Sequence, residues 1–291
     1  MFFTRICWKG RIILNNGWSE VCLNSVDEIL AKFIEFRNNT RRWVYRGMHD
    51  DYLQPLLPSF DRYTRCVGDR KTKINLERQS IELFRSTYTQ LAIEEDRDYL
   101  RKDITTLMLM QHYGGPTRLL DWSLSPYIAA YFAICEGDDS DGFIWSFDYD
   151  RYEEMGPKQW YAFPEMYEEN NFKTLAPAFC VDYPAYNADL KDKNWIVCQF
   201  VLNDRFKFNR IRNQEGLFTF ASQFDIDHSQ ALRELLDGSE YHIVYRIRKE
   251  DKKPLRKYLY DKCQIWHGMM YPDVVGAAEA VKERLKDLVC P

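Results

Sequence analysis

The chain has 291 residues, of which 45% are hydrophobic and 15% aromatic, a globular composition with enough apolar material for a sizeable core. A formal net charge of −4 excludes a uniformly basic protein that coats duplex DNA, but it leaves room for a local basic groove. No apolar run approaches the roughly 18 residues that span a bilayer, and the N-terminus does not fit a signal peptide, so we expect a cytoplasmic protein without membrane contacts.

Metal-binding and several common catalytic signatures are missing from the sequence. The eight cysteines are scattered and form no C-x-x-C pair, and no two of the five histidines lie four residues apart. Neither a P-loop nor a G-x-S-x-G elbow is present. We therefore predict reduced thiols and no metal site.

The first third of the chain alternates predicted strands and helices. Residues 1–24 read as a β-rich segment, and the helix that follows in "SVDEILAKFIEFRNN" has Ser25 as its cap and Glu28 completing a capping box. The segment "RRWVYRG", residues 41–47, reads as a strand with Trp43 and Tyr45 on one face and Val44 on the other. Helices are predicted at 74–92 and 98–114, and Gly114 is well placed to end the second.

The remainder of the chain continues this mixture. Ser125 and Pro126 begin a helix that reaches residue 135, and "GFIWSFDY" follows as a strand. Residues 149–173 show no clear period and are predicted to be an insertion loop. Strands are expected at 195–202, 205–211, 216–222 and 241–248, and helices at 254–262 and 272–289. Because strands and helices do not alternate regularly, we predict an α+β fold in one domain, 1–291, with core motifs at 43–147 and the 194–289 segment in the same unit.

Arg46 lies where the "RRWVYRG" strand ends. Its guanidinium is always charged and planar, so it can direct a rigid fork of donors into a cleft, and Gly47 allows a backbone or a ligand to approach closely. The alternative is a surface arginine that pairs with Asp50 or Asp51.

The densest group of polar residues lies in "LMQHYGGPTRLLDWSLSPYIAAYFA", residues 109–133. Polar groups on a turn between two helices are typical of a binding site; here they are Gln111, His112, Tyr113, Arg118, Asp121, Trp122, Ser123 and Ser125. Each also has a structural interpretation. Arg118 and Asp121 can form a buried pair that holds the turn, Trp122 can belong to the core, and Ser125 can simply cap its helix.

These motifs resemble the FRG domain family, which is named for its (F/Y)-R-G signature. "WVYRG", "LLPS" and "QHYGGPTRLLDWSLSPYIAAYFA" match the family pattern over about residues 43–147, and weaker similarity continues in "RIRNQEGLFTF" and "MMYPDVVGAAEAVKERL". The resemblance implies a bacterial or phage protein of the kind found beside toxin and phage-defence genes, with a partner protein as a potential neutraliser.

A looser resemblance to R-S-E mono-ADP-ribosyltransferases implies a chemistry. Those enzymes have a strand ending in Y-R-G or F-R-G, a later Ser-x-Ser element before a helix, and a catalytic Glu before a further strand. The matching positions are Arg46, Ser123 and Glu215. The sequence departs from the pattern, because those enzymes usually read Ser-Thr-Ser where this chain has Ser123-Leu124-Ser125. At the third element, Glu215 directly follows Gln214 and no Q-x-E or E-x-E is formed.

The second resemblance implies a split β-sheet core and NAD as co-substrate. Arg46 would bind the pyrophosphate, Glu215 would stabilise the ribose cation, and Ser123 would orient Glu215 or the ribose. Tyr113 or Trp122 would stack on nicotinamide. The rest of the predicted NAD contacts are Tyr45, Gly47, Gln111, His112, Arg118, Asp121 and Gln214. If this interpretation holds, Arg46, Ser123 and Glu215 line one cleft between two packed sheets, or Gln214 takes the third position.

Two functions follow from these interpretations. The first is an NAD-dependent ADP-ribosyltransferase, whose acceptor is DNA, RNA, a protein or a small molecule. We favour a base in single-stranded or flipped-out nucleic acid, for which the aromatic richness provides stacking surfaces. The second is a non-catalytic nucleotide-binding or interaction module of a defence system.

Overall fold

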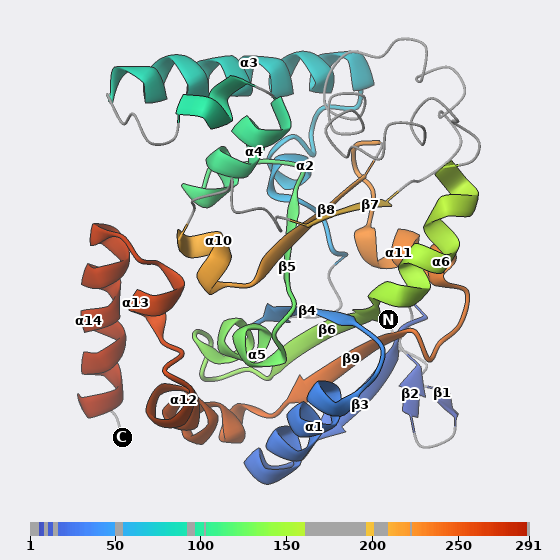
Figure 1. The fold of residues 1–291 in the computed structure, drawn as a ribbon, viewed down its shortest axis with the longest axis vertical. Coiled ribbons are helices and arrows are strands. Elements are labelled where there is room, and N and C mark those ends of the chain that lie inside the picture. The colour runs from blue at the N-terminus through green and yellow to red at the C-terminus, as the bar shows by residue number, and fades with distance from the viewer. Residues whose placement is uncertain are drawn as a thin grey trace.

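The computed structural model describes residues 6–8, 11–13, 17–49, 55–91, 97–101, 103–160, 196–200, 209–221 and 223–289. These residues form an α+β fold around one mixed sheet of nine strands (Figure 1). The sheet order is β1-β2-β3-β9-β6-β4-β5-β8-β7, and among these described strands the β3–β9 pair is parallel and the others are antiparallel. The strands are β1 (Ile6–Trp8), β2 (Arg11–Ile13), β3 (Ser19–Leu23), β4 (Trp43–Met48), β5 (Leu120–Ser123), β6 (Gly142–Asp148), β7 (Ile196–Phe200), β8 (Gly216–Ala221) and β9 (His242–Ile247).

The sheet has a narrow joint in its middle. Strand β4 is paired with β6 through six residue pairs, but it is paired with β5 through Tyr45 and Ser123 alone. In Figure 1, β5 accordingly runs steeply across the direction of β4 and connects the upper and lower parts of the molecule. The expected pair of packed sheets is therefore replaced by one sheet whose two parts diverge at this joint.

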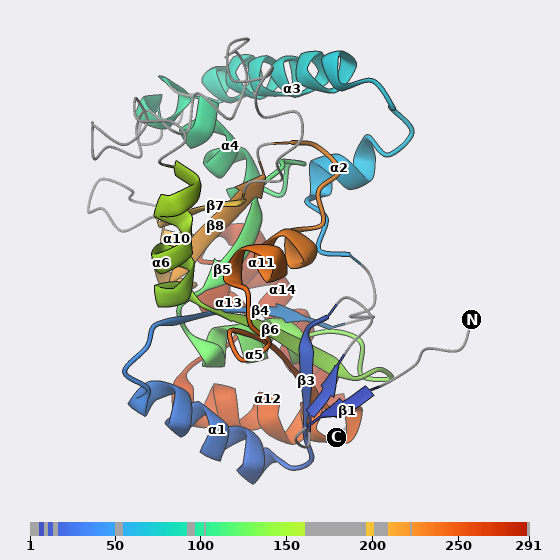
Figure 2. The same ribbon diagram turned by 90° about the vertical axis from the view of Figure 1, so that its right-hand side faces the viewer.

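Helices cover both faces of the lower part, as Figure 2 shows from the side. One face carries α1 (Val26–Asn38), α5 (Pro126–Ile134) and α12 (Lys249–Cys263), and the other carries α6 (Tyr149–Trp160) and α11 (His228–Leu236). The alternation of β4 follows this division, because Val44 joins the core on the α11 side and Tyr45 joins the core on the α5 side. The predicted faces of this strand are confirmed.

The upper part holds α2 (Ser59–Tyr63), α3 (Arg70–Gln90), the 3₁₀ helix η1 (Arg97–Arg101) and α4 (Asp103–His112). Apolar side chains of α3 and α4 pack on Phe218 and Phe220 of β8. Helix α4 ends as predicted, because Gly114 has a left-handed φ of 82° and the Gly115 N–H donates to the Met110 carbonyl at 2.8 Å. The short helices α10 (Asn209–Asn213) and α13 (His267–Met270) and the C-terminal α14 (Val274–Val289) complete the fold.

Glycine at position 47 lets β4 lie directly against α5. A Cβ on Gly47 would sit 1.9 Å from the Ala129 carbonyl oxygen and 2.6 Å from the Ala133 nitrogen, both of them α5 backbone atoms. The small residues of "PYIAAYFA" allow this close approach, since Ala129 and Ala133 are fully buried beneath the strand. The glycine of the Y-R-G signature therefore meets a structural requirement of strand–helix packing.

Both predicted helix starts are found. The Ser25 hydroxyl accepts a hydrogen bond from the Glu28 N–H at 3.2 Å, while the Glu28 carboxylate reaches the Asn24 N–H, one residue earlier than a standard capping box would place it. Ser125 occupies the cap position of α5, but its side chain makes no cap hydrogen bond.

Three predicted elements are corrected by the structure. Residues 149–160 of the expected insertion loop form helix α6, and residues 161–173 lie outside the described residues. The helix begins where the Asp148 carboxylate accepts a hydrogen bond from the Arg151 N–H, and it buries Tyr149 and Tyr152 one turn apart. In the expected 205–211 strand, residues 209–211 belong to helix α10, and 205–208 also lie outside the described residues. Helix α12 begins at Lys249, so Pro254 lies within it.

Helix α11 was not predicted, although its signals are local. Asp227 caps it by accepting from the Ser229 N–H, and Ala231, Leu232 and Leu235 are buried at helical spacing. Within the described part of the chain, no helix is both long enough and apolar enough to cross a membrane.

Candidate functional site

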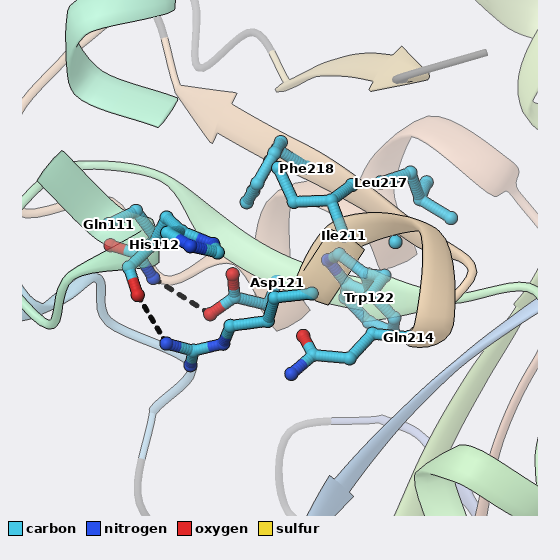
Figure 3. Close-up of a pocket in the computed structure, with 10 residues that line it drawn as sticks. Gln111, His112, Asp121, Trp122, Ile211, Gln214, Leu217 and Phe218 are labelled. Carbon is cyan, nitrogen blue, oxygen red and sulfur yellow. Dashed lines mark hydrogen bonds between the residues drawn. The ribbon is translucent and has the colours of Figure 1, made fainter. Parts of the chain in front are cut away.

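An open pocket lies where β4 meets β5. We call it the Arg46 pocket. It is lined by Tyr45, Arg46, Gly47, Asp121, Trp122, Ser123, Ala129, Phe132, Arg210, Gln214 and Tyr271. A small neighbouring pocket, the Gln111 pocket, shares Asp121, Trp122, Arg210 and Gln214 with it and extends to Gln111, His112 and Phe218 (Figure 3).

Arg46 is held at the wall of its pocket by the neighbouring strand. Its Nη1 donates to the Asp121 carbonyl oxygen at 2.6 Å and lies 3.9 Å from the Asp121 carboxylate, and its side chain is 22% exposed. Its Nε is buried and has no hydrogen-bond partner among the described residues. Burial lowers the pKa of Arg46. The negative charge of Asp121 raises this pKa, and the positive charge of Arg62 lowers it further. The alternative partners Asp50 and Asp51 lie outside the described residues.

A hydrogen-bonded chain connects the turn before β5 to the pocket. The Thr117 hydroxyl donates to the Gln111 side-chain oxygen at 2.5 Å, and the Gln111 amide donates in turn to the Asp121 carboxylate at 2.7 Å (Figure 3). Thr117 is fully buried, whereas the Asp121 side chain is 49% exposed. The motif "QHYGGPTRLLDW" therefore places the Asp121 carboxylate in the lining of both pockets, and Gln111 and the buried Thr117 hold it there.

Arg118 does not line either pocket and does not pair with Asp121. Its guanidinium makes a bidentate ion pair with Glu77 of α3, with N–O distances of 2.8 and 2.6 Å, and it lies over the Phe224 ring. Arg118 and Glu77 are both almost fully buried. The turn is therefore held by α3 and not by an Arg118–Asp121 pair, because the Arg118 side chain points to Glu77 while the Asp121 side chain points to the pocket.

Ser123 joins the turn after β5 to the turn before β8. Its hydroxyl donates to the Gln214 carbonyl oxygen at 2.7 Å and accepts from the Ser125 N–H at 3.0 Å. The Gln214 side chain donates to the Met270 carbonyl oxygen at 3.0 Å. Arg46, Ser123 and Gln214 thus meet in one pocket, although they are far apart in the sequence.

Glu215 is not brought into this arrangement. Among the described residues, the pocket linings include its neighbours Gln214 and Gly216 but not Glu215, whose side chain is exposed. The reason is local: Glu215 has a left-handed φ of 45°, and its carbonyl oxygen accepts from the Leu124 N–H. The predicted position of the carboxylate is taken by an amide, and the carboxylate of the site is that of Asp121.

The predicted aromatic contacts are divided between core and pocket. Trp122 is 3% exposed and donates to the Thr219 hydroxyl at 2.8 Å, so it forms the pocket floor. Tyr45 also lines the pocket from a buried position. Tyr113 is 49% exposed beside Tyr88 and is not among the described lining residues.

Two prominent lining residues were not predicted, Arg210 and Tyr271. The Arg210 guanidinium lies 4.2 Å from the centre of the Tyr271 ring and donates to the His112 carbonyl oxygen. His267 stacks on the same ring with a centroid distance of 4.6 Å. A sequence signal for both existed, because they lie in the segments "RIRNQEGLFTF" and "MMYPDVVGAAEAVKERL".

The combined site offers groups of three kinds. Two guanidinium groups, Arg46 and Arg210, suit an anion such as a diphosphate. Aromatic surface from Phe132 and Tyr271 suits a planar ring. Asp121 adds one negative charge. The described residues contain no group of three or more His, Cys, Asp or Glu side chains that could hold a metal ion.

Comparison with known protein families gives a match over part of the chain. Residues 41–142 match the family model of the FRG domain. No curated protein and no solved structure matches the chain. The matched span includes Arg46, Asp121 and Ser123, whereas Arg210, Gln214 and Tyr271 lie beyond it.

Proposed function

We propose that this FRG-domain protein binds NAD in the Arg46 pocket and transfers its ADP-ribose to an acceptor, as a mono-ADP-ribosyltransferase of a bacterial or phage conflict system. The observation that carries the proposal is the meeting of Arg46, Arg210 and Asp121 in one pocket beside Ser123 and Gln214. Two cations and one anion at a partly apolar site match a ligand with a diphosphate, planar rings and a ribose that becomes positively charged.

The chemistry assigns a task to each kind of group. The planar fork of Arg46 has a buried Nε and, among the described residues, a single hydrogen bond, from Nη1 to Asp121, so it is suited to diphosphate oxygens. Cleavage of the nicotinamide–ribose bond produces an oxocarbenium-like transition state, which a nearby carboxylate stabilises. Tyr271 is fixed by Arg210 over its ring and by His267 stacked on it, and it adds aromatic surface to the pocket lining.

For the acceptor, we propose a base in single-stranded or flipped-out nucleic acid. The net charge of −4 disfavours tight duplex binding, which depends on many phosphate contacts. A single extruded base requires stacking and a few hydrogen bonds, which an aromatic pocket supplies at lower positive charge.

The test compares NAD binding by the wild type with binding by Arg46→Lys, using calorimetry. Lysine keeps the charge but lacks the fork, so the affinity should fall by about tenfold or more. Arg212→Lys changes an exposed arginine near the pocket and should leave the affinity unchanged. Equal affinity in Arg46→Lys and the wild type would refute the role of Arg46.

A second assay measures nicotinamide release from NAD by the purified wild type, with and without single-stranded DNA or RNA. Release supports the transferase. NAD binding without any release supports the alternative, a non-catalytic nucleotide-binding module, for which the position of Glu215 outside the pocket is the favouring observation.

A further inference from the structure

We propose that Asp121 is the catalytic carboxylate of this site and that Gln111 and Thr117 are its positioning residues. The inference rests on the proposed NAD-dependent transfer and deepens it, because it names the group that stabilises the ribose cation in place of Glu215.

Asp121 is the one carboxylate among the described residues that line the two pockets, and it lines both. Its side chain is half exposed while its backbone carbonyl holds Arg46 by a 2.6 Å hydrogen bond. The residue proposed to bind the diphosphate and the residue proposed to face the ribose are thus fixed relative to each other. Loss of the Asp121 side chain leaves the backbone contact to Arg46 in place.

The orientation of the carboxylate is set from the protein interior. The Leu119 N–H donates to the Thr117 hydroxyl at 3.1 Å, which leaves the hydroxyl proton for the Gln111 side-chain oxygen. The amide of Gln111 must then present its NH₂ group to Asp121, because an ionised carboxylate only accepts. This bond holds Oδ2 (Figure 3), and no described residue donates to Oδ1, so Oδ1 is available to a ligand.

The proposed step is a substitution at the anomeric carbon of the NAD ribose. The bond between this carbon and the nicotinamide nitrogen breaks, and nicotinamide leaves as a neutral molecule with the electron pair. The Asp121 carboxylate stabilises the ribose cation. An N–H or O–H nucleophile of the acceptor then bonds to the same carbon, and its proton passes to Asp121 and on to solvent.

The first test compares two variants that each convert one carboxylate to an amide. Asp121→Asn should lower nicotinamide release at saturating NAD by about 10² or more while the NAD dissociation constant stays within about threefold. Glu215→Gln, the matched control, should keep the wild-type rate. Release by Asp121→Asn within about threefold of the wild type, or an equal loss in Glu215→Gln, would overturn the assignment.

The second test keeps Asp121 and changes its neighbours. Gln111→Glu places a second carboxylate beside Asp121 and raises the pKa of that carboxyl, so the acid limb of the pH–rate profile should move to higher pH. Thr117→Ser keeps the hydroxyl and should keep the wild-type profile, whereas Thr117→Val should lower the rate. An acid limb that stays in place in Gln111→Glu would overturn the positioning role.

The two proposals fail in different ways. A wild-type protein that neither binds NAD nor releases nicotinamide overturns the proposed function and this inference together. An active wild type with an equally active Asp121→Asn overturns only the assignment of Asp121, and the transferase stands.

Discussion

Replacing Gly47 by alanine should destabilise the fold rather than selectively remove a ligand contact. The added Cβ would lie 1.9 Å from the Ala129 carbonyl oxygen and 2.8 Å from the Phe132 Cβ, whereas real Cβ contacts essentially never fall below 3.0 Å. Strand β4 and helix α5 would have to separate by at least about 1.1 Å, and their backbones cannot rotate away as a side chain can. Overpacking in a core costs about 1–3 kcal/mol, and the backbone contacts place Gly47→Ala near the upper end.

Urea unfolding followed by circular dichroism at pH 7 measures this cost. We expect the free energy of unfolding to fall by about 3 kcal/mol, a large part of the roughly 5–15 kcal/mol typical of a domain. Gly68→Ala is the matched control, because a Cβ at Gly68 meets nothing within 4 Å, and it should be neutral or slightly stabilising. A stable Gly47→Ala protein that has lost NAD binding would refute the packing argument and favour direct ligand contact.

Three further predictions concern buried ionisable groups, and urea unfolding measures each of them. Glu77→Gln removes the carboxylate charge that pairs with the buried Arg118 guanidinium and should cost about 3 kcal/mol, so a cost below about 1 kcal/mol would contradict the pairing. Burial raises the pKa of Asp61 to about 6, so this residue's stabilising effect is present below pH 4 and is lost as pH rises through 6. The Asp61→Asn protein should therefore be more stable than the wild type at pH 7, by about 3 kcal/mol, and equally stable at pH 4. Burial lowers the pKa of His228 to about 3 and that of His242 to about 4, so the free energy of unfolding should fall as pH drops below 6.5. In the His228→Asn protein, the free energy of unfolding should fall less than in the wild type between pH 6.5 and 4.5.

Local features of the fold were predictable because short-range rules govern them. The alternation of Val44 and Tyr45 gives the two faces of β4, and the cap at Ser25 marks the start of α1. The same rules failed at residues 209–211, where an alternating pattern predicts a strand. Ile211 packs instead with Phe218 and Phe220 of β8 through helix α10, so tertiary packing against this strand overrides the local strand preference.

Partners of charged residues were the least predictable part of the site. Arg118 and Asp121 are three residues apart and of opposite charge, yet Arg118 pairs with Glu77, which lies 41 positions earlier. Asp121 receives its hydrogen bond from Gln111. Opposite charge at short spacing therefore indicates a pair only when both side chains point to the same side of the chain.

The architecture divides the site between the FRG span and the segments that follow it. Strand β5 contributes Asp121 and Ser123, but β5 is joined to β4 by a single residue pair and to β8 by four. Pairing with β8 therefore places the Gln214 turn against Ser123, whose hydroxyl fixes the Gln214 carbonyl. The groups held by the FRG span, Arg46 and Asp121, are those to which the proposed chemistry assigns the diphosphate and the ribose. Because Arg210 and Tyr271 come from the later segments, changes there can alter which ring or acceptor the pocket accepts while the central groups stay in place.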